Sequence, residues 1–348
     1  MRSEPRFHFV ILTCRDPDTD FRRPLVEALS ALGPTTYAWL RRRPLVSGPA
    51  TGGVTREMSL VRFLATMARL RRRDAIPVYL NSTNTYFPGM TLVLRLLAPR
   101  GVWCFDLHDD LRYHNTGLKR VTESLIVRLL AALSHEIVHA APTLQRLFPR
   151  SRHLGNASHL RPGRRDAARA DAVLVIASFD ERLDFPFLAA VMRRNPGLTF
   201  DLRGWVRADD APTRKALEAL LAACPNAVYH GPYAMADLPD MLAQYKVTLA
   251  PYRTGSPLTD YIDPLRFYHC LNAGLEVVST PIPQAVTMSD CIHVVTDVDT
   301  CSATILAVLD GRAAKQPDYA PVTWEQKARR FKEIVLDSQR TQALAAAR

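Results

Sequence analysis

Basic and aromatic residues follow successive strand-like segments in the second half of this 348-residue sequence. Arg253 comes directly after one predicted strand, and Arg266 falls in the first turn of the helix that follows. The carboxyl ends of parallel strands meet at one edge of a sheet, where basic side chains and helix N-terminal amides stabilise a diphosphate. Taken singly, each of these residues is more often a solvated surface arginine. Together they predict an anion-binding site that comprises Arg203, Gly231, Tyr233, Tyr252, Arg253, Asp263, Pro264, Arg266 and His269.

A second group of candidate residues lies at the end of the predicted strand 101–107. Asp109 and Asp110 follow His108, and a carboxylate in a cleft that excludes water can act as general base on a hydroxyl group. A neighbouring carboxylate would help to raise its pKa. The alternative is a pair of aspartates that caps a helix or forms a turn. A metal site of the Asp-X-Asp type is only weakly indicated.

The segment from His135 to His139 reads HEIVH. On a helix this spacing places two imidazoles on one face as zinc ligands, with Glu136 as general base. The β-branched residues Ile137 and Val138 instead favour a strand, in which Glu136 points away from both histidines. We therefore expect a strand here, and a zinc metallopeptidase is a remote alternative.

The elements that position these residues alternate between strand and helix. Predicted strands are 7–14, 35–40, 77–80, 101–107, 172–177, 198–202, 227–230, 247–250 and 277–280. Predicted helices are 24–32, 56–73, 90–97, 117–134, 185–194, 213–223, 236–244, 263–272, 302–309 and a long one from Trp324. Such alternation predicts parallel sheets with helices on both faces. Residues 155–169 are rich in basic and turn residues and form the natural domain boundary.

Charge divides the sequence into two unlike halves. Residues 1–170 hold 27 Lys and Arg against 13 Asp and Glu, whereas residues 171–348 hold 18 against 21. A basic half fits nucleic acid, an anionic membrane or a phosphorylated substrate, or is only a solvated arginine-rich face. The predicted helix 56–73 carries arginines beside an apolar stripe, which suits either an anionic bilayer or ordinary core packing. The lack of an aromatic-rich basic module argues against nucleic acid.

The sequence also favours a cytoplasmic protein. No window holds 18 uninterrupted apolar residues, so we expect neither a membrane span nor a signal peptide. The six cysteines form no CxxC pair and lie among apolar segments, as reduced core thiols do.

Several segments resemble the donor domain of bacterial GT-B glycosyltransferases, of the family 4 type and its relatives that build exopolysaccharide, capsule and lipopolysaccharide glycans. They are FDERLDFPFLAAVMRRNPGLTFDLRG, VYHGPYAMADLPDMLAQYKV, LAPYR, DYIDPLRFYHCLNAGLEVVSTPIP and TWEQKARRF, within about 172–334. CFDLHDDL and HEIVHAAPTLQRLF, followed by LGNAS, are similar to the family's first domain, more weakly.

This resemblance implies an α/β protein with the GT-B fold, two Rossmann-like domains facing across a cleft. Residues 1–165 would bind the acceptor, residues 166–322 would bind the nucleotide-sugar donor, and the helix in 323–348 would cross back to the first domain. The nine residues of the predicted anion site become donor-binding candidates, and Asp109 and Asp110 become catalytic ones. The resemblance implies no cofactor and no essential metal, since the nucleoside-diphosphate sugar is the substrate and basic side chains take the metal's place.

The sequence departs from the family pattern at four places, one of which is the glycine-rich loop after the first strand, replaced here by Arg15-Asp-Pro-Asp-Thr-Asp20. Arg266 stands where the family usually has lysine, and it keeps the charge. His269 stands where a glutamate usually binds the donor ribose, and histidine cannot accept two hydroxyl bonds as a carboxylate does. The usual arginine and lysine pair after the donor domain's first strand is represented at most by Arg182.

We therefore expect a glycosyltransferase of the hexosyltransferase type in cell-surface polysaccharide biosynthesis. It would move a sugar from a nucleotide donor to a polyprenyl-diphosphate-linked or glycan acceptor. The enzyme would be peripheral on the cytoplasmic face of the plasma membrane, with its basic N-terminal half on the anionic surface and no nucleic-acid partner. A nucleotide-sugar epimerase and a degenerate, binding-only GT-B protein are the alternatives.

Overall fold

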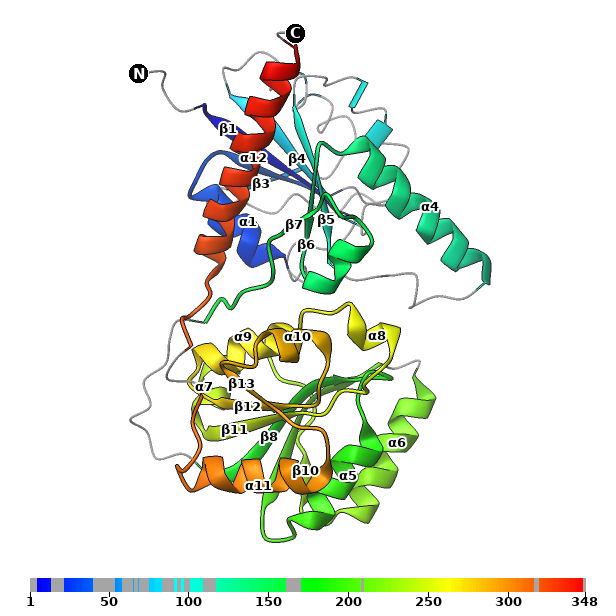
Figure 1. Ribbon diagram of the computed structural model, residues 1–348, viewed down its shortest axis with the longest axis vertical. Helices are drawn as coiled ribbons and strands as arrows, with labels where there is room; N and C mark the ends of the chain where they lie inside the picture. Colours follow the sequence, from blue (N-terminus) through cyan, green and yellow to red (C-terminus); the bar gives the residue numbers. More distant parts are fainter. Residues whose placement is uncertain are drawn as a thin grey trace. The chain divides into compact units, whose positions relative to one another are not determined.

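The chain divides into two compact units, each built on one parallel sheet. The computed structural model describes residues 5–13, 22–39, 54–57, 65, 68, 75–82, 91–92, 95–96, 101–108, 117–160, 170–207, 210–315 and 319–346. The first unit comprises Met1–Asn156 and Trp324–Arg348, and the second comprises Ala157–Thr323 (Figure 1). The first unit is therefore assembled from both ends of the chain.

Seven parallel strands form the sheet of the first unit, in the order β3-β2-β1-β4-β5-β6-β7. They are β1 (Phe7–Thr13), β2 (Thr35–Trp39), β3 (Val54–Glu57), β4 (Ile76–Ser82), β5 (Val102–Leu107), β6 (Glu136–His139) and β7 (Arg152–His153). All six residues of β5 are buried, as expected for a central strand covered on both faces.

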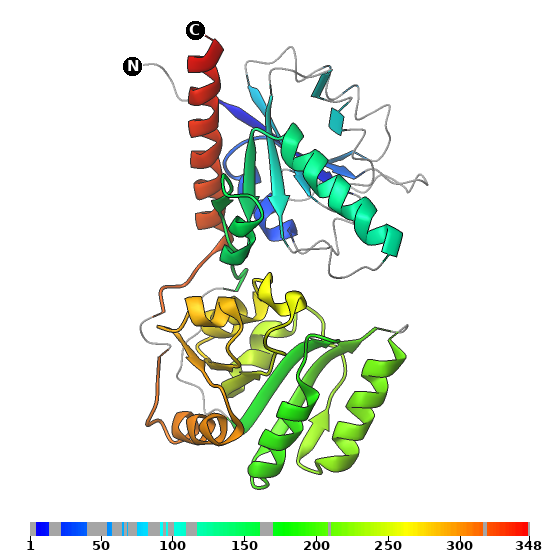
Figure 2. The same ribbon diagram turned by 45° about the vertical axis from the view of Figure 1, so that its right-hand side comes forward.

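The longer helices of the first unit are α1 (Arg23–Ser30), α4 (Gly117–Leu133) and α12 (Trp324–Ala346), and a short 3-10 helix, η2, spans Pro142–Arg146. α12 packs against α1, β5 and β6, and its Phe331 contacts Phe9 of β1 with ring centroids 6.4 Å apart. Figure 2 shows the strands of this sheet between α12 and α4. α12, the 23-residue last helix of the chain, thus completes the core of the unit that contains the N-terminal strands.

The second unit has a six-stranded parallel sheet in the order β10-β9-β8-β11-β12-β13. Its strands are β8 (Ala170–Phe179), β9 (Thr199–Val206), β10 (Ala227–Tyr229), β11 (Tyr245–Ala250), β12 (Glu276–Ser279) and β13 (Ile292–Val294). Its helices are α5 (Phe185–Arg194), α6 (Ala211–Ala223), α7 (Leu238–Ala243), α8 (Pro257–Asp260), α9 (Leu265–Asn272), α10 (Pro283–Thr287) and α11 (Val298–Leu309).

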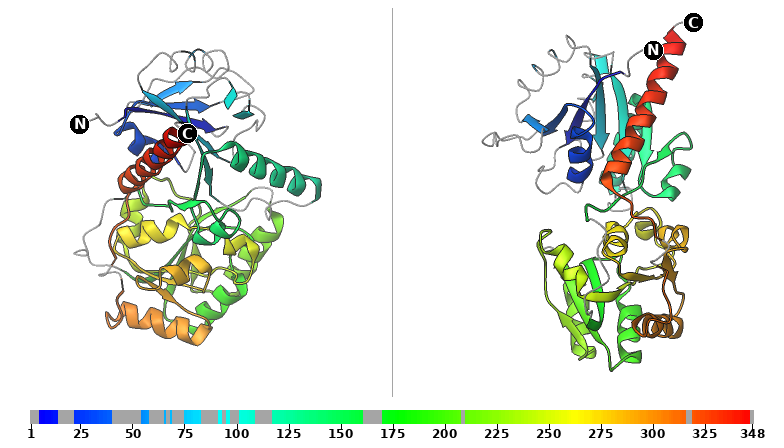
Figure 3. Two further views of the ribbon diagram at one scale, coloured as in Figure 1. Left: turned by 45° about the horizontal axis from the view of Figure 1, so that its top comes forward. Right: turned by 90° about the vertical axis from the view of Figure 1, so that its left-hand side faces the viewer.

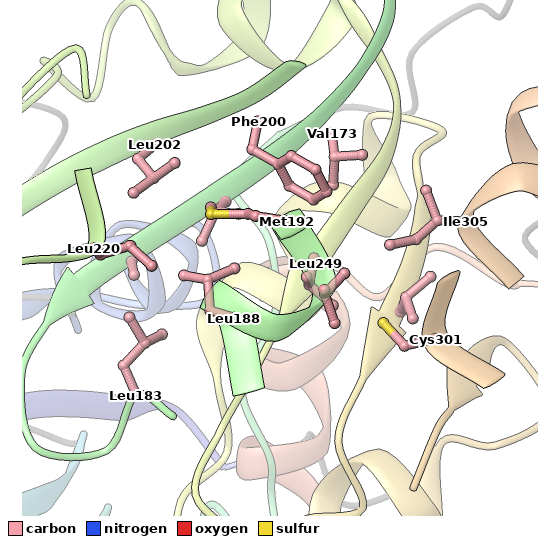
Figure 4. Close-up of a cluster of buried hydrophobic side chains, with 14 of the residues drawn as sticks. Val173, Leu183, Leu188, Met192, Phe200, Leu202, Leu220, Leu249, Cys301 and Ile305 are labelled. Carbon is pink, nitrogen blue, oxygen red and sulfur yellow. The ribbon is translucent and has the colours of Figure 1, made fainter. Parts of the chain in front are cut away.

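Two apolar clusters cover the two faces of this second sheet, because side chains alternate along each strand. Val173 and Val175 of β8 face α5, α6 and α11, in the cluster that Figure 4 shows. Leu174 and Ile176 face α7, α9 and α10. The three-layer arrangement of the second unit leaves the loops after its strands at one edge of the sheet (Figure 3).

The expected alternation of strand and helix is confirmed through the second unit and in the described part of the first; most of the predicted helix 90–97 lies outside the described residues. The predicted helix 185–194 coincides with α5, and HEIVH forms β6, as the β-branched pair indicated. Because Glu136–His139 is a strand, the helical pair of zinc ligands that a metallopeptidase needs is not formed.

Two predicted boundaries were wrong in an informative way. Residues 56 and 57, predicted to begin a helix, belong to β3; most of the predicted helix 56–73 lies outside the described residues. Arg203 and Gly204, expected after a strand, lie inside β9. β9 continues through Gly204, which has a φ of 140° and approaches β8 closely. A Cβ there would lie 1.6 Å from the Ala177 carbonyl oxygen, so only glycine fits at this point of the strand.

Candidate functional site

Two arginines and one aspartate meet where β8 and β11 end in the second unit. Asp180 comes directly after β8 and accepts hydrogen bonds from the Nε and backbone nitrogen of Arg182, both at 3.0 Å. Arg266, in the first turn of α9, donates from Nη1 to the carbonyl oxygen of Ile176 at 2.8 Å. Burial alone would raise the pKa of Asp180, but Arg182 outweighs it with help from Arg266, and the pKa is lowered. Arg182 thus pairs with Asp180, and Arg266 lies close enough to lower the pKa of the same carboxylate.

Two tyrosine side chains lie close to the guanidinium group of Arg266. The guanidinium carbon of Arg266 lies 4.4 Å from the centroid of the Tyr252 ring, a cation–π contact. Burial raises the pKa of Tyr252, while Arg266 and Arg182 oppose the shift. Burial also raises the pKa of Tyr233 to about 12, and Arg266 acts against it there too. Tyr233, Tyr252 and Arg266 are three of the nine predicted donor-site residues, and the structure brings them together.

Backbone hydrogen bonds fix the loops that carry these residues. The Arg253 nitrogen donates to the Arg182 carbonyl oxygen at 2.8 Å, and Leu183 forms an isolated bridge with Tyr252. At the neighbouring strand ends, the Gly204 nitrogen donates to the Gly231 carbonyl oxygen at 2.9 Å. Gly231 has a φ of 76°, a conformation that glycine adopts at little cost. The loop after β8 is therefore held to the loop after β11, and the last part of β9 is held to the loop after β10.

Other predicted donor-site residues have different surroundings. Arg203 lies beside the hydroxyl of Tyr245, which donates to Asp201 at 2.9 Å. The Arg253 side chain is exposed in the loop after β11. Asp263 is buried and accepts from the Tyr268 hydroxyl at 2.9 Å, while Pro264 is the N-cap of α9, which begins two residues later than predicted. Asp263 and Pro264 thus shape the entry to α9, and Asp263 holds Tyr268.

His269 is enclosed within the second unit. Its Nδ1 is 2.8 Å from the Ser158 hydroxyl oxygen, and its ring meets that of His159 edge-on at 4.8 Å between centroids. Burial lowers its pKa to about 3, and His159 adds to the shift, so the imidazole is neutral at physiological pH. A neutral imidazole engaged by Ser158 keeps one ring nitrogen for any other partner, whereas a carboxylate would offer two oxygens.

The proposed catalytic pair, Asp109 and Asp110, lies outside the described residues. The structure does describe the strand end that leads to it, β5 and His108. There, Arg22 donates to Asp106 Oδ1 at 2.9 Å and to Asn156 Oδ1 at 3.1 Å, and it also contacts both ring nitrogens of His108. The Trp324 ring lies 5.5 Å from its guanidinium carbon. We call Arg22, Asp106, His108 and Asn156 the Arg22 cluster.

The Arg22 cluster is enclosed and balanced. Arg22 is 5% exposed and Asp106 is 1% exposed. Burial would raise the pKa of Asp106, but Arg22 and His108 outweigh it and the pKa falls below its ordinary value. Sequence reasoning missed the role of Arg22, which lies 84 residues before Asp106 in an Arg-Arg-Pro helix start that looks solvated.

The described residues give no structural reason to invoke a metal at either cluster. Within the described ranges, no group of three or more His, Cys, Asp or Glu side chains is arranged to hold a metal ion. The five described cysteines are free, and four of them are buried. The positive charge of the second unit's site comes from Arg182 and Arg266, which is the chemistry that suits a bound diphosphate.

Two Rossmann-like parallel sheets, each with helices on both faces, define the GT-B fold, and comparison with solved structures shows that the chain adopts it. Sucrose-phosphate synthase from Thermosynechococcus elongatus superposes with a TM-score of 0.67 at 15% identity, over 99% of this chain and 100% of that one. HepE from Anabaena, solved in complex with UDP and glucose, gives 0.61 at 11% identity, over 98% and 99%. AviGT4, a glycosyltransferase involved in avilamycin A biosynthesis, gives 0.60 at 14% identity, over 97% of each chain. No protein-family model and no curated protein sequence matches the chain.

Proposed function

We propose that this protein is a glycosyltransferase that takes a sugar from a nucleoside-diphosphate donor bound by its second unit. One observation carries the proposal: Arg182 and Arg266 lie together at the carboxyl edge of a parallel sheet, where both lower the pKa of Asp180. These two cations would stabilise a leaving diphosphate. The GT-B fold adds support, since HepE was also solved with UDP-glucose.

The Tyr252 and Tyr233 rings would restrict how the diphosphate and its neighbours lie on the charged group. The cation–π contact with the Tyr252 ring orders the Arg266 guanidinium before a ligand binds. Such preorganisation lowers the entropic cost of binding. His269 would approach the donor as a neutral hydrogen-bonding group, a weaker ribose partner than a glutamate.

The acceptor would bind to the first unit, with Asp109 or Asp110 as the general base if the reaction inverts configuration. If configuration is retained, the same carboxylate would instead position the acceptor hydroxyl. We propose a polyprenyl-diphosphate-linked or glycan acceptor in cell-surface polysaccharide biosynthesis, reached from the cytoplasmic face of the membrane. The basic character of the first half of the chain supports an anionic, membrane-borne acceptor.

Donor binding is tested by calorimetric titration with UDP and UDP-glucose, followed by thermal-shift screening of other nucleotide sugars. We expect binding by the wild type and a loss of about 100-fold in Arg266→Met, because one of two cations facing the diphosphate is removed. Arg312→Met is the matched control: Arg312 is 68% exposed in the same unit and pairs with Asp310. Equal affinities of the two variants would overturn the assignment of the donor site.

Catalysis is tested separately with Asp109→Asn and Asp110→Asn. We expect one of them to lower sugar transfer by at least about 100-fold while donor binding stays unchanged. Unimpaired transfer in both variants would remove these residues from the mechanism.

A binding-only protein is the second candidate, and His269 is the specific observation that favours it. It predicts nucleotide-sugar binding without transfer, hydrolysis or release of an epimerised sugar. Mass-spectrometric analysis of the donor after long incubation with lipid and glycan acceptors separates these outcomes.

A further inference from the structure

Helix α4 of the first unit has two apolar faces, of which only one is used by the fold. Val127, Leu130 and Ala131 are buried and attach the helix to the unit, where it packs on β5. On the opposite side, Leu118, Val121, Leu125 and Leu129 form a row spaced three, four and four residues apart. We call these four residues the α4 stripe.

The α4 stripe is open to solvent. Its side chains are 82%, 54%, 61% and 39% exposed, in chain order. Twelve large hydrophobic side chains are exposed in the described part of the chain, and four of them form this single row. Scattered exposed leucines need no explanation, but a contiguous row on one helix marks an interaction surface.

Positive charge borders the α4 stripe. Lys119, Arg120 and Arg128 are exposed on the same helix, against one acidic residue, Glu123. The whole first unit carries 29 Lys and Arg against 15 Asp and Glu, a net charge of +14, whereas the second unit has 16 against 19, or −3. An apolar row flanked by cations on a basic body is the composition of a helix that lies in the interface of an anionic bilayer.

The shape of the helix allows that contact. The first turns of α4 extend beyond the strands of its sheet in Figure 1 and in the left-hand view of Figure 3. The buried residues are confined to its last two turns, so its first ten residues are held by few contacts. None of the helices in the described ranges has the length and apolarity of a membrane span. Contact with lipid would therefore lie in the plane of the membrane.

We propose that α4 docks this protein on anionic membranes by inserting the α4 stripe between lipid headgroups, with Lys119 and Arg128 on the surrounding phosphates. The inference deepens the proposed function, because it names the surface that would bring the first unit to a membrane-borne acceptor. It does not depend on the donor site, since docking requires neither nucleotide nor transfer.

The test is flotation of the full-length protein with vesicles of phosphatidylcholine and phosphatidylglycerol, at low and high salt. We expect binding to vesicles with 30–40% anionic lipid, roughly the upper range of cell membranes, and at least about tenfold weaker binding to pure phosphatidylcholine, because several cations contribute. Raising the salt concentration should weaken binding as charges are screened.

The decisive variant is Leu118→Gln/Leu125→Gln, which removes the two most exposed apolar side chains of the α4 stripe without touching the buried face. We expect at least about tenfold weaker vesicle binding, because each leucine contributes by burying apolar surface in the interface. The matched control is Leu306→Gln/Leu344→Gln, which changes two leucines exposed on other helices, at 40% and 69%.

Three outcomes would overturn the proposal. They are equal vesicle binding by the two double variants, salt-independent binding to neutral vesicles, and a wild-type dimer that only Leu118→Gln/Leu125→Gln dissociates. The last outcome, read by light scattering, would make the α4 stripe a contact between two copies of the chain. Nucleotide titration of the same variants keeps the two hypotheses apart, since we expect both to bind UDP as the wild type does.

Discussion

The two units place arginine at corresponding positions, beyond the carboxyl end of a central strand, yet use it in opposite ways. In the first unit, Arg22 is 6% exposed through its side chain and is matched by Asp106, with His108 and Asn156 filling its remaining directions. In the second unit, the Arg182 side chain is 28% exposed and pairs with Asp180, whose pKa Arg266 also lowers. We call the enclosed Arg22 cluster a structural lock, and we propose that the partly exposed arginines of the second unit bind an anion.

Breaking the lock should have the largest effect on stability. Arg22→Met leaves Asp106 buried without its cation, and we expect the free energy of unfolding to fall by about 3–5 kcal/mol. The adjacent Arg23→Met is the matched control, because Arg23 is 43% exposed and pairs with Glu27 one turn away. That exposed pair contributes about 0.5 kcal/mol or less. Urea unfolding that gives the two variants equal midpoints would contradict the description of Arg22 as a lock.

The same substitution at Arg266 in the second unit should have a small effect on stability and a large effect on nucleotide affinity. Arg266→Met loses one hydrogen bond to Ile176 and a cation–π contact, so we expect the free energy of unfolding to fall by only about 1–2 kcal/mol. Nucleotide affinity should meanwhile fall about 100-fold, as stated for the donor site. If Arg266→Met instead destabilised the protein as much as Arg22→Met, Arg266 would be a second lock and the contrast between the units would fail.

The pH dependence of stability tests whether buried His269 is neutral in the folded protein. An unfolded histidine takes up a proton near pH 6.5, whereas His269 in the folded protein does so only near pH 3. Between those values the unfolded state binds more protons, so stability falls as the pH falls from 6.5 towards 3. His269→Gln removes this contribution and should make the loss between pH 7.5 and pH 5 smaller, as measured by urea unfolding. An equal loss in both proteins would show that the imidazole is protonated in the folded state.

The smallest expected effect concerns the ring beneath Arg266. Tyr252→Leu removes the aromatic face and should weaken UDP binding about three- to tenfold, because the guanidinium loses its support. Tyr252→Phe keeps that face and should stay within about threefold of the wild type. If calorimetry gave Tyr252→Phe and Tyr252→Leu the same weakened affinity for UDP, the hydroxyl rather than the ring would order Arg266.

The sequence predicted the fold well because the signals involved are local. The predicted helix 185–194 coincides with α5, to which the structure adds Asp184 as N-cap, and the β-branched pair in HEIVH located β6. The site was predicted only in part, because contacts such as Arg182 with Asp180 depend on where strands end. The end of β9 was predicted too early, since nothing local reveals that Gly204 lets the strand continue to Val206 beside Ala177 of β8. The Arg22 cluster could not be predicted, because Arg22 and Asn156 are 134 residues apart and meet only in the folded unit.

The chain order of the two units has a consequence for biosynthesis. The second unit is one continuous segment, Ala157–Thr323, whereas the first waits for Trp324, Phe331 and Ile334 of α12 to fill its core. On the ribosome, the second unit can therefore fold while the first still exposes apolar surface to water. We expect nascent chains that stop before α12 to need chaperones, although they already contain every strand of both sheets.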